Sequence, residues 1–191
     1  LEKAKKDLDN NQKLLDELQQ LNDKISNEDL QDKLEKFKQN SKNQVKTLEQ
    51  LVELTKKYYV EKKAAQIAEK LDKLSEKQNQ LSDSDKENNS ENQEEINKAF
   101  DKIEEELNDL DKQNKELKSP LDISKDAEKE KSVANDLNKS KEQLQKSQKE
   151  KAIPKQKSAS KKMKEMSKKM EQSMESSEME QLQEDVVMLR Q

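Results

Sequence analysis

Apolar residues recur at alternating spacings of three and four along most of this chain, a pattern typical of helices that each bury one face. The first run covers residues 1–25 and is interrupted by Asn11 and Asn22. Polar residues at such positions fix register or partner geometry, although a shift of the buried face would also account for them. Ser26 and Asp29 have the spacing of a capping box, which predicts a tight helical hairpin, with an uninterrupted helix as the alternative.

The longest predicted helix covers residues 28–81, because no glycine or proline interrupts the pattern there. Such a helix would extend about 80 Å. Apolar density is greatest from Leu51 to Tyr59, where the apolar face shifts by one stripe. Two adjacent tyrosines point about 100° apart, so one can enter the core while the other faces a second neighbour. We therefore expect three helices to meet there, in the best-buried part of the molecule. The expected contact network is Leu48, Leu51, Val52, Tyr58, Leu71, Ile103 and Leu107.

Residues 82–93 contain no apolar side chain and are predicted to be a flexible acidic linker that buries nothing. The alternation of Asp83, Asp85 and Glu87 also fits the start of a calcium loop. Such a loop needs glycine at its sixth position, where Asn88 stands, so a solvated linker is the favoured interpretation.

Two more helices are predicted after the linker. A capping box of Ser90 and Gln93 begins the first, and residues 91–118 carry the most regular heptad pattern in the chain. Pro120 forces the residue before it out of the helical region and ends this helix. The pattern at 125–150 is weaker and predicts a helix that is frayed or partly disordered.

A lysine- and methionine-rich helix is predicted at 155–191, after a break at Pro154. Four of its methionines share one face. Thioethers bind Cu(I) or silver, but methionine at this spacing is more often a packing residue, and the surrounding lysines would repel a cation. A third interpretation is an amphipathic helix that touches an anionic membrane or a partner groove. The candidate partner-binding residues of the chain are Tyr58, Tyr59, Lys161, Lys162, Met163, Met166, Met170 and Met174.

The composition excludes most catalytic chemistry. The 191 residues include no glycine, cysteine, histidine or tryptophan, and only 28% are hydrophobic, too few for a compact core of that size. Phosphate-binding loops need glycine, and the usual metal sites and nucleophile–base pairs need histidine or cysteine. Neighbouring carboxylates at 94–95 and 104–106 point apart on a helix and have no apolar pocket to shift their pKa. We expect no enzyme, no cofactor, no metal and no small-molecule substrate.

Charge narrows the possible partners. A net charge of −4 and a single arginine, Arg190, argue against nucleic acid. Residues 82–119 hold six lysines and thirteen acidic residues, whereas 155–169 hold seven lysines and one acidic residue, so these two belts are expected to pair. No apolar run reaches the roughly 18–20 residues that span a bilayer. The chain starts and stops within apolar repeats, which favours a piece of a longer protein.

Several stretches resemble a known family. They are Leu54-Thr-Lys-Lys-Tyr-Tyr-Val60, Ala68-Glu-Lys-Leu-Asp-Lys-Leu74, Glu116-Leu-Lys-Ser-Pro-Leu-Asp-Ile123, Gln156-Lys-Ser-Ala-Ser-Lys-Lys-Met-Lys-Glu-Met-Ser-Lys-Lys-Met170 and Gln183-Glu-Asp-Val-Val-Met-Leu-Arg-Gln191. These are similar to the central coiled-coil part of the large Bacteroidota envelope proteins catalogued as a domain of unknown function. The resemblance covers about residues 50–191. It implies a cell-envelope location, possible only with a membrane anchor outside this stretch, and it supplies no catalytic residues.

Together these patterns predict an all-α fold, an elongated antiparallel coiled coil or open bundle of about five helices. The expected divisions are a helical hairpin with a long spine helix at 1–81, the acidic linker at 82–93, a helical hairpin broken at Pro120 at 94–150, and the Lys/Met-rich helix at 155–191. The expected function is a non-catalytic structural or scaffolding segment that binds a protein partner or a second copy of itself. The alternative is a peripheral membrane or lipid-binding module that uses the Lys/Met-rich helix.

Overall fold

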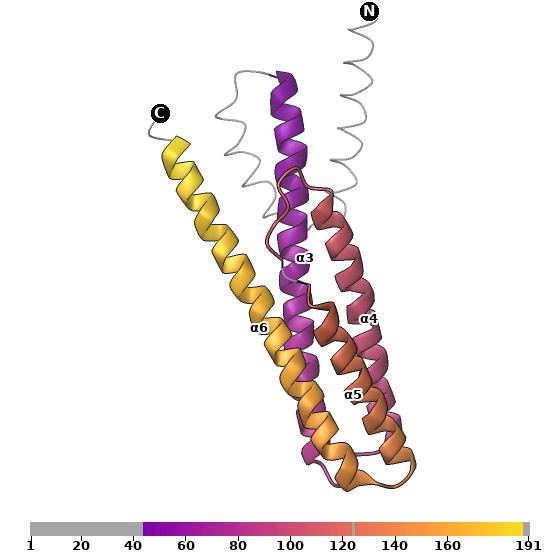
Figure 1. The fold of residues 1–191 in the computed structure, drawn as a ribbon. Coiled ribbons are helices and arrows are strands. Elements are labelled where there is room, and N and C mark those ends of the chain that lie inside the picture. The colour runs from indigo at the N-terminus through magenta and orange to yellow at the C-terminus, as the bar shows by residue number, and fades with distance from the viewer. Residues whose placement is uncertain (1–43, 124, 189–191) are drawn as a thin grey trace, which may run out of the picture. The chain divides into compact units, whose positions relative to one another are not determined.

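The computed structural model describes residues 44–123 and 125–188, which form four α-helices and no β-strand. The all-α fold class is therefore confirmed for this part of the chain. The helices, labelled as in Figure 1, are α3 (Gln44–Asp83), α4 (Ser90–Lys115), α5 (Ala127–Gln145) and α6 (Lys149–Met188). The helix predicted at 1–25 and the capping box that follows it lie outside the described residues.

The chain divides into two compact units. The larger contains Lys63–Gln113 and the chain from Leu121 onward, so it includes segments of all four helices. The smaller contains the described residues up to Lys62 together with Asn114–Pro120. Within the smaller unit, the backbone N–H of Lys118 donates to Oε1 of Glu53 at 2.6 Å.

The core of the larger unit follows the predicted three-and-four spacing. The heptad pattern of α4 is confirmed, because its apolar side chains are all buried: Ile96, Phe100, Ile103, Leu107 and Leu110. The other three helices supply the opposing side. Their buried apolar residues in this unit are Ala64, Ile67, Ala68, Leu71, Leu74 and Leu81 from α3, Val133 and Leu137 from α5, and Ala152, Ala159, Met163, Met166 and Met170 from α6.

Helices α3 and α6 contact each other through small residues. The hydroxyl of Ser160 donates to the backbone carbonyl of Ser75 at 2.7 Å, and that of Ser167 donates to the carbonyl of Ala68 at 2.8 Å. Both partners change by seven residues and in opposite order, so the helices run in opposite directions. Because a serine hydroxyl is one bond from Cβ, these distances also require the two backbones to approach closely.

The connection between α3 and α4 differs from the predicted linker. Helix α3 continues to Asp83 and α4 begins at Ser90, which leaves a short turn at 84–89. The expectation that this stretch buries nothing is wrong, because Asn88 is 4% exposed and Gln93 is fully buried. The predicted capping box is also wrong. Asn89 caps α4 by accepting the N–H of Asn92 at 2.9 Å, and the Gln93 side chain is used in the core instead.

The predicted break at Pro154 is wrong as well. Helix α6 begins at Lys149 and includes this proline. In the second turn of the helix, proline removes one backbone hydrogen bond. Ala152 and Gln156, on either side of it, are both fully buried, so their packing compensates for that loss.

Helix α5 is a core element and not the weak helix expected at 125–150. Asp126 caps it by accepting the N–H of Lys129 at 3.0 Å. Val133 is 0% exposed and Leu137 is 1% exposed, which is as deep as any apolar residue of α4. The pattern looked weak because the rest of the buried face is polar: Glu130, Asp136 and Ser140.

The best-buried part of the chain is not the Leu51–Tyr59 stretch. Val52 is buried there, but Tyr58 and Tyr59 are both half-exposed. The deepest run on α3 instead extends from Ala64 to Gln78. It buries deeply because it faces three helices of the larger unit, whereas the side chains of Leu48 and Leu51 lie outside those described.

Candidate functional site

Three of the four methionines predicted as a binding face point into the core. Met163, Met166 and Met170 are 0%, 6% and 2% exposed. Met174, one turn further along α6, is half-exposed. The packing interpretation of the methionine row therefore matches where the side chains lie. A partner that binds the intact bundle would meet the charged side of α6 and not these thioethers.

The lysines of α6 pair with α3 and α5. Lys164 lies 3.0 Å from Asp72 on α3, and Lys157 lies 2.9 Å from Asp83 at the end of the same helix. Acidic residues of α4 are paired elsewhere: Glu106 lies 2.6 Å from Lys70 of α3. For the described residues, the expectation that the basic belt pairs with the acidic helix 91–118 is corrected by these partners.

Asp136 on α5 is the most enclosed of these ion-pair partners. Its side chain is 5% exposed, and its Oδ2 accepts hydrogen bonds from Lys162 at 2.5 Å and from Ser158 at 2.7 Å. Lys155 lies 3.4 Å from Oδ1. Burial opposes ionisation, but the hydrogen bonds from Lys162 and Ser158 outweigh it, so the pKa of Asp136 is lowered. This carboxylate joins α5 to α6.

A group of buried amides joins all the connected helices at the end of the bundle near the α3–α4 turn. The buried amide cluster comprises Gln78 of α3, Asn88 of the turn, Gln93 and Asn97 of α4, and Gln156 of α6. Gln78, Gln93 and Gln156 are 0% exposed. Because unpaired amides in a dry core are costly, such a cluster is stable only if its members satisfy one another.

The hydrogen bonds of the cluster meet that condition. Gln78 and Gln93 donate to each other at 3.1 and 2.7 Å, and Gln156 and Asn88 do so at 2.8 and 3.0 Å. Gln156 also donates to Gln93 at 2.8 Å, which connects the two pairs. Gln93 donates to Asn97 at 3.0 Å, and Asn97 in turn donates to Asn138 of α5 at 3.1 Å.

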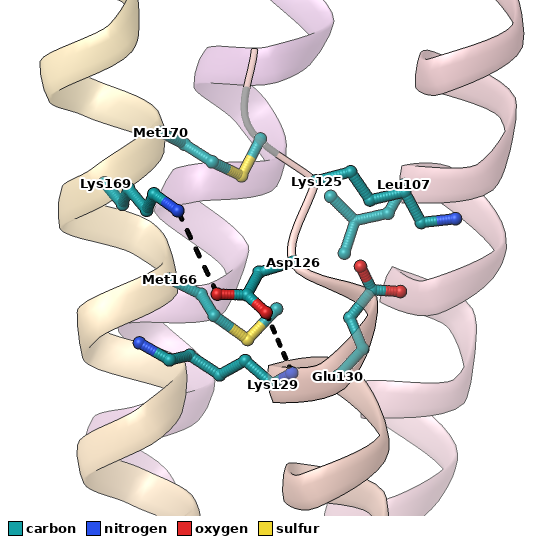
Figure 2. Close-up of a pocket in the computed structure, with 8 residues that line it drawn as sticks. All are labelled: Leu107, Lys125, Asp126, Lys129, Glu130, Met166, Lys169 and Met170. Atoms are coloured by element: carbon teal, nitrogen blue, oxygen red, sulfur yellow. Dashed lines mark hydrogen bonds and ion pairs between the residues drawn. The ribbon is translucent and has the colours of Figure 1, made fainter.

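A small hollow lies where α4, α5 and α6 meet, shown in Figure 2. Its lining residues are Leu107, Lys125, Asp126, Lys129, Glu130, Met166, Lys169 and Met170. It has room for about one water molecule. Asp126 lies between Lys129 and Lys169 in this view, and the thioethers of Met166 and Met170 face the interior. The hollow is too small for an organic substrate.

Glu130 is the unusual residue of this hollow. It is 6% exposed, and its Oε1 has no hydrogen-bond partner. Burial raises the pKa of Glu130, while nearby Lys125 acts in the opposite direction. Across from it on α4, burial and the charge of Glu130 raise the pKa of Glu104. These two carboxyls differ from the other neighbouring carboxylates of α4: Glu94, for example, pairs with Lys141 and has a lowered pKa.

Metal and membrane chemistry find little support in the described residues. Across 44–123 and 125–188, no group of three or more carboxylate side chains is arranged to hold a metal ion. Within the same residues, no helix is both long enough and apolar enough to cross a bilayer.

The remaining candidates lie on the surface. Lys161 is exposed, and Lys162 is half-exposed and engaged with Asp136. Nζ of Lys62 lies 5.8 Å from the centre of the Tyr58 ring, within reach of a cation–π interaction. The structure therefore does not bring the tyrosines and the methionines together into one site within either unit, and their partner-binding role stays a prediction.

Sequence reasoning missed Asp136, Asn88 and Gln156. A signal existed for Gln156, because it lies seven residues before Met163 and so extends the methionine face through Pro154. The other two have no apolar pattern to mark them. Comparison with known proteins adds nothing here, since no protein-family model, no curated protein and no solved structure matches the chain. Its similarity to the Bacteroidota envelope proteins stays a prediction.

Proposed function

We propose that this chain is a non-catalytic structural or scaffolding segment, built as an antiparallel coiled-coil bundle, that offers its charged outer faces to a protein partner. The observation that carries the proposal is how the interior is occupied. Methionines fill the α6 side, the amides of the buried cluster satisfy one another, and the hollow beside Glu130 has room for about one water. In the described part of the chain, the outer faces are what remains for recognition.

Heptad-spaced contacts support the coiled-coil part of the proposal. The two serine contacts between α6 and α3 are seven residues apart on both helices. Between α5 and α4, Lys141 contacts Glu94 and Asn138 contacts Asn97, so both partners change by three in opposite order. Contacts at spacings of three and seven along one face are those of neighbouring antiparallel helices.

The envelope location within the proposal rests on the family resemblance. Under that resemblance, the chain is part of a larger envelope protein whose membrane anchor lies in another segment. A long charged helical segment would then space or dock partners at a distance from the bilayer.

The rival proposal, a peripheral membrane module, requires more rearrangement. Met163 and Met170 would have to leave the core to reach lipid, and Lys162 would have to release Asp136. An amphipathic helix binds a bilayer through its exposed apolar face, whereas the apolar face of α6 is covered along these residues.

Site-specific photo-crosslinking tests the scaffold proposal. A photoreactive amino acid would replace the exposed Lys161 or Lys168 of α6, which are seven residues apart. Glu95 and Lys102 of α4, also exposed and seven apart, provide a matched pair on another face. With the parent protein in its own cells, we expect one discrete protein adduct from one pair and little from the other. Absence of a discrete adduct from both faces would overturn the proposal.

Vesicle sedimentation tests the rival. The purified chain should stay in the supernatant with phosphatidylcholine vesicles, with or without phosphatidylserine. Co-sedimentation that depends on phosphatidylserine and is abolished by Lys161→Glu with Lys168→Glu would favour the membrane module. The same double substitution leaves the buried face of α6 unchanged, so helix content measured by circular dichroism serves as its control.

A further inference from the structure

The α3–α4 turn contains no residue that forbids a helix. Residues 84–89 include neither glycine nor proline, and none of them has a positive φ. The α5–α6 turn is different, because Ser147 there has φ of 59°. Local sequence therefore permits α3 and α4 to continue into one helix, and contacts from the rest of the bundle must select the turn.

Some of those contacts hold the backbone groups that the turn frees. The carbonyl of Asp85 accepts a hydrogen bond from Lys149 of α6. The carbonyl of Glu87 accepts from the side chain of Asn92 at 2.7 Å, and the N–H of Glu87 donates to the Ser84 hydroxyl at 3.2 Å. These side chains are exposed, so water can replace them at small cost.

Asn88 supplies the buried contact. Its side chain is 4% exposed and exchanges two hydrogen bonds with Gln156, at 2.8 and 3.0 Å. Gln156 is itself fully buried, so without Asn88 part of its amide would be left without a partner in a dry core. Among the residues of the turn, Asn88 is thus the one whose position affects the interior directly.

The Gln78–Gln93 pair shows what opening the turn would do. These amides exchange hydrogen bonds across the hairpin. Fifteen residues of continuous helix would separate them by about 22 Å. In one straightened chain the pair cannot form. It can form again if Gln78 of one copy meets Gln93 of a second.

We propose that Asn88 is a latch that keeps α3 and α4 as a hairpin within one chain, and that its release allows a second form in which two copies exchange α3 through a continuous α3–α4 helix. Exchange of identical elements costs little because nearly every contact is rebuilt between the copies. The contacts that are not rebuilt belong to the hinge. Asn88 lies in that hinge, so its pairing with Gln156 favours the closed chain.

The continuous helix would run from Gln44 to Lys115 and extend about 108 Å. For a structural segment, this form would join two copies and lengthen the assembly. The inference goes beyond the proposed function and is independent of the identity of any outside partner, because its test uses the purified chain alone.

Asn88→Ala tests the latch. By removing two hydrogen bonds that only the closed chain makes, it should lower the dimer dissociation constant by at least about tenfold. Light scattering after size-exclusion chromatography over a range of concentrations gives this constant. Lys86→Ala is the matched control: it adds the same helix-forming residue to the same turn, at an exposed position, and should behave as the wild-type chain.

A distance measurement shows whether the dimer forms by exchange. Because the chain has no cysteine, Lys77→Cys with Glu95→Cys allows two spin labels to be attached at exposed positions on either side of the turn. In labelled chains diluted with unlabelled ones, the separation should be short in the monomer and about 27 Å in the dimer. Adding Lys86→Pro to Asn88→Ala should restore the monomer, because proline disrupts a continuous helix.

Two results would overturn the proposal. One is a folded Asn88→Ala variant with the same dimer constant as Lys86→Ala. The other is a dimer whose label separation matches the monomer, which would mean side-by-side association. If Asn88→Ala fails to fold, Asn88→Asp replaces it: this near-isosteric side chain keeps the acceptor for Gln156 and loses the donor, so a smaller shift toward dimer is expected, and no shift would be equally decisive.

Discussion

Nζ of Lys162 on α6 lies 2.5 Å from Oδ2 of Asp136 on α5, whose side chain is only 5% exposed. Asp136→Asn should lower the free energy of unfolding at neutral pH by about 1–3 kcal/mol, because it removes a buried charge-assisted hydrogen bond while the partly exposed lysine regains water. Urea unfolding measures the difference. Glu95→Gln, an exposed carboxylate of α4, should change stability little and serves as the control.

The effect of Asp136 should depend on pH in a definite direction. Its pKa is lowered in the folded chain from an ordinary value of 3.8. The stability it contributes is therefore complete above that ordinary value and is lost as the pH falls through the folded pKa. The difference between wild type and Asp136→Asn should shrink in acid. A difference of the same size in acid and at neutral pH would mean that packing, and not the carboxylate charge, is responsible.

Glu130 should behave in the opposite way. Burial raises its pKa in the folded chain, so its contribution to stability is present below the unfolded pKa and is lost as the pH rises through the folded pKa. Glu130→Gln, which removes this buried charge, should raise the free energy of unfolding at neutral pH by about 1 kcal/mol and by less in acid. The exposed Glu128 of the same helix gives the control, Glu128→Gln, which should produce no gain.

The neighbour of Glu130 provides a second readout. The charge of Glu130 is one cause of the raised pKa of Glu104, so Glu130→Gln should lower the pKa of Glu104. Carboxyl NMR titration measures it directly. An unchanged pKa at Glu104 would show that burial alone sets it.

Ser147 adopts a conformation that favours glycine. Its φ is 59°, and it follows α5 at the position where the N–H of Ser147 donates to Leu144 at 3.0 Å and the N–H of Gln148 donates to Gln143 at 2.8 Å. These two bonds define a Schellman motif, in which glycine usually occupies the left-handed position. Ser147→Gly should raise the free energy of unfolding by about 1 kcal/mol, measured by urea unfolding. Ser147→Ala keeps the strain and should not stabilise; equal effects of the two substitutions would contradict this explanation.

The sequence predicts α4 better than any other described helix, for a physical reason. Ile96, Phe100 and Leu107 mark its buried face with large apolar side chains, so periodicity alone identifies it. Much of the buried face of α5 is polar instead, with Asp136 and Ser140 among its members. A polar residue is recognised as buried only when its hydrogen-bond partner is known, and that partner lies on another helix.

The candidate site shows the same division. The methionine row of α6 is visible as a spacing, and its packing role follows from thioethers at core positions. The pairing of Asn88 with Gln156 joins residues 68 positions apart, and no local pattern indicates it. Likewise, the belts of opposite charge correctly suggest pairing within the chain, but composition does not determine which helices become neighbours.

The close approach of α3 and α6 depends on small side chains. Ser167→Ala should cost about 1 kcal/mol, the value of one buried hydrogen bond. Ser167→Leu should cost about 1–3 kcal/mol, because the added volume forces the helices apart. Ser176→Leu on the exposed side of the same helix is the control. If Ser167→Leu proves no more destabilising than Ser167→Ala, the helices have room between them and the close contact is not required.

Leu137 and Leu107 provide the sharpest test of where the core lies. From the sequence, a substitution in the weak 125–150 helix should cost much less than one in α4. The structure reverses that expectation, because Leu137 is 1% exposed and Leu107 is 5% exposed. Leu137→Ala and Leu107→Ala should each lower the free energy of unfolding by about 2–5 kcal/mol, since both leave a cavity among packed side chains. Half-exposed Leu144, near the end of α5, is the matched control, and Leu144→Ala should cost clearly less. A loss at Leu137 no greater than that at Leu144 would mean that α5 does not belong to the core.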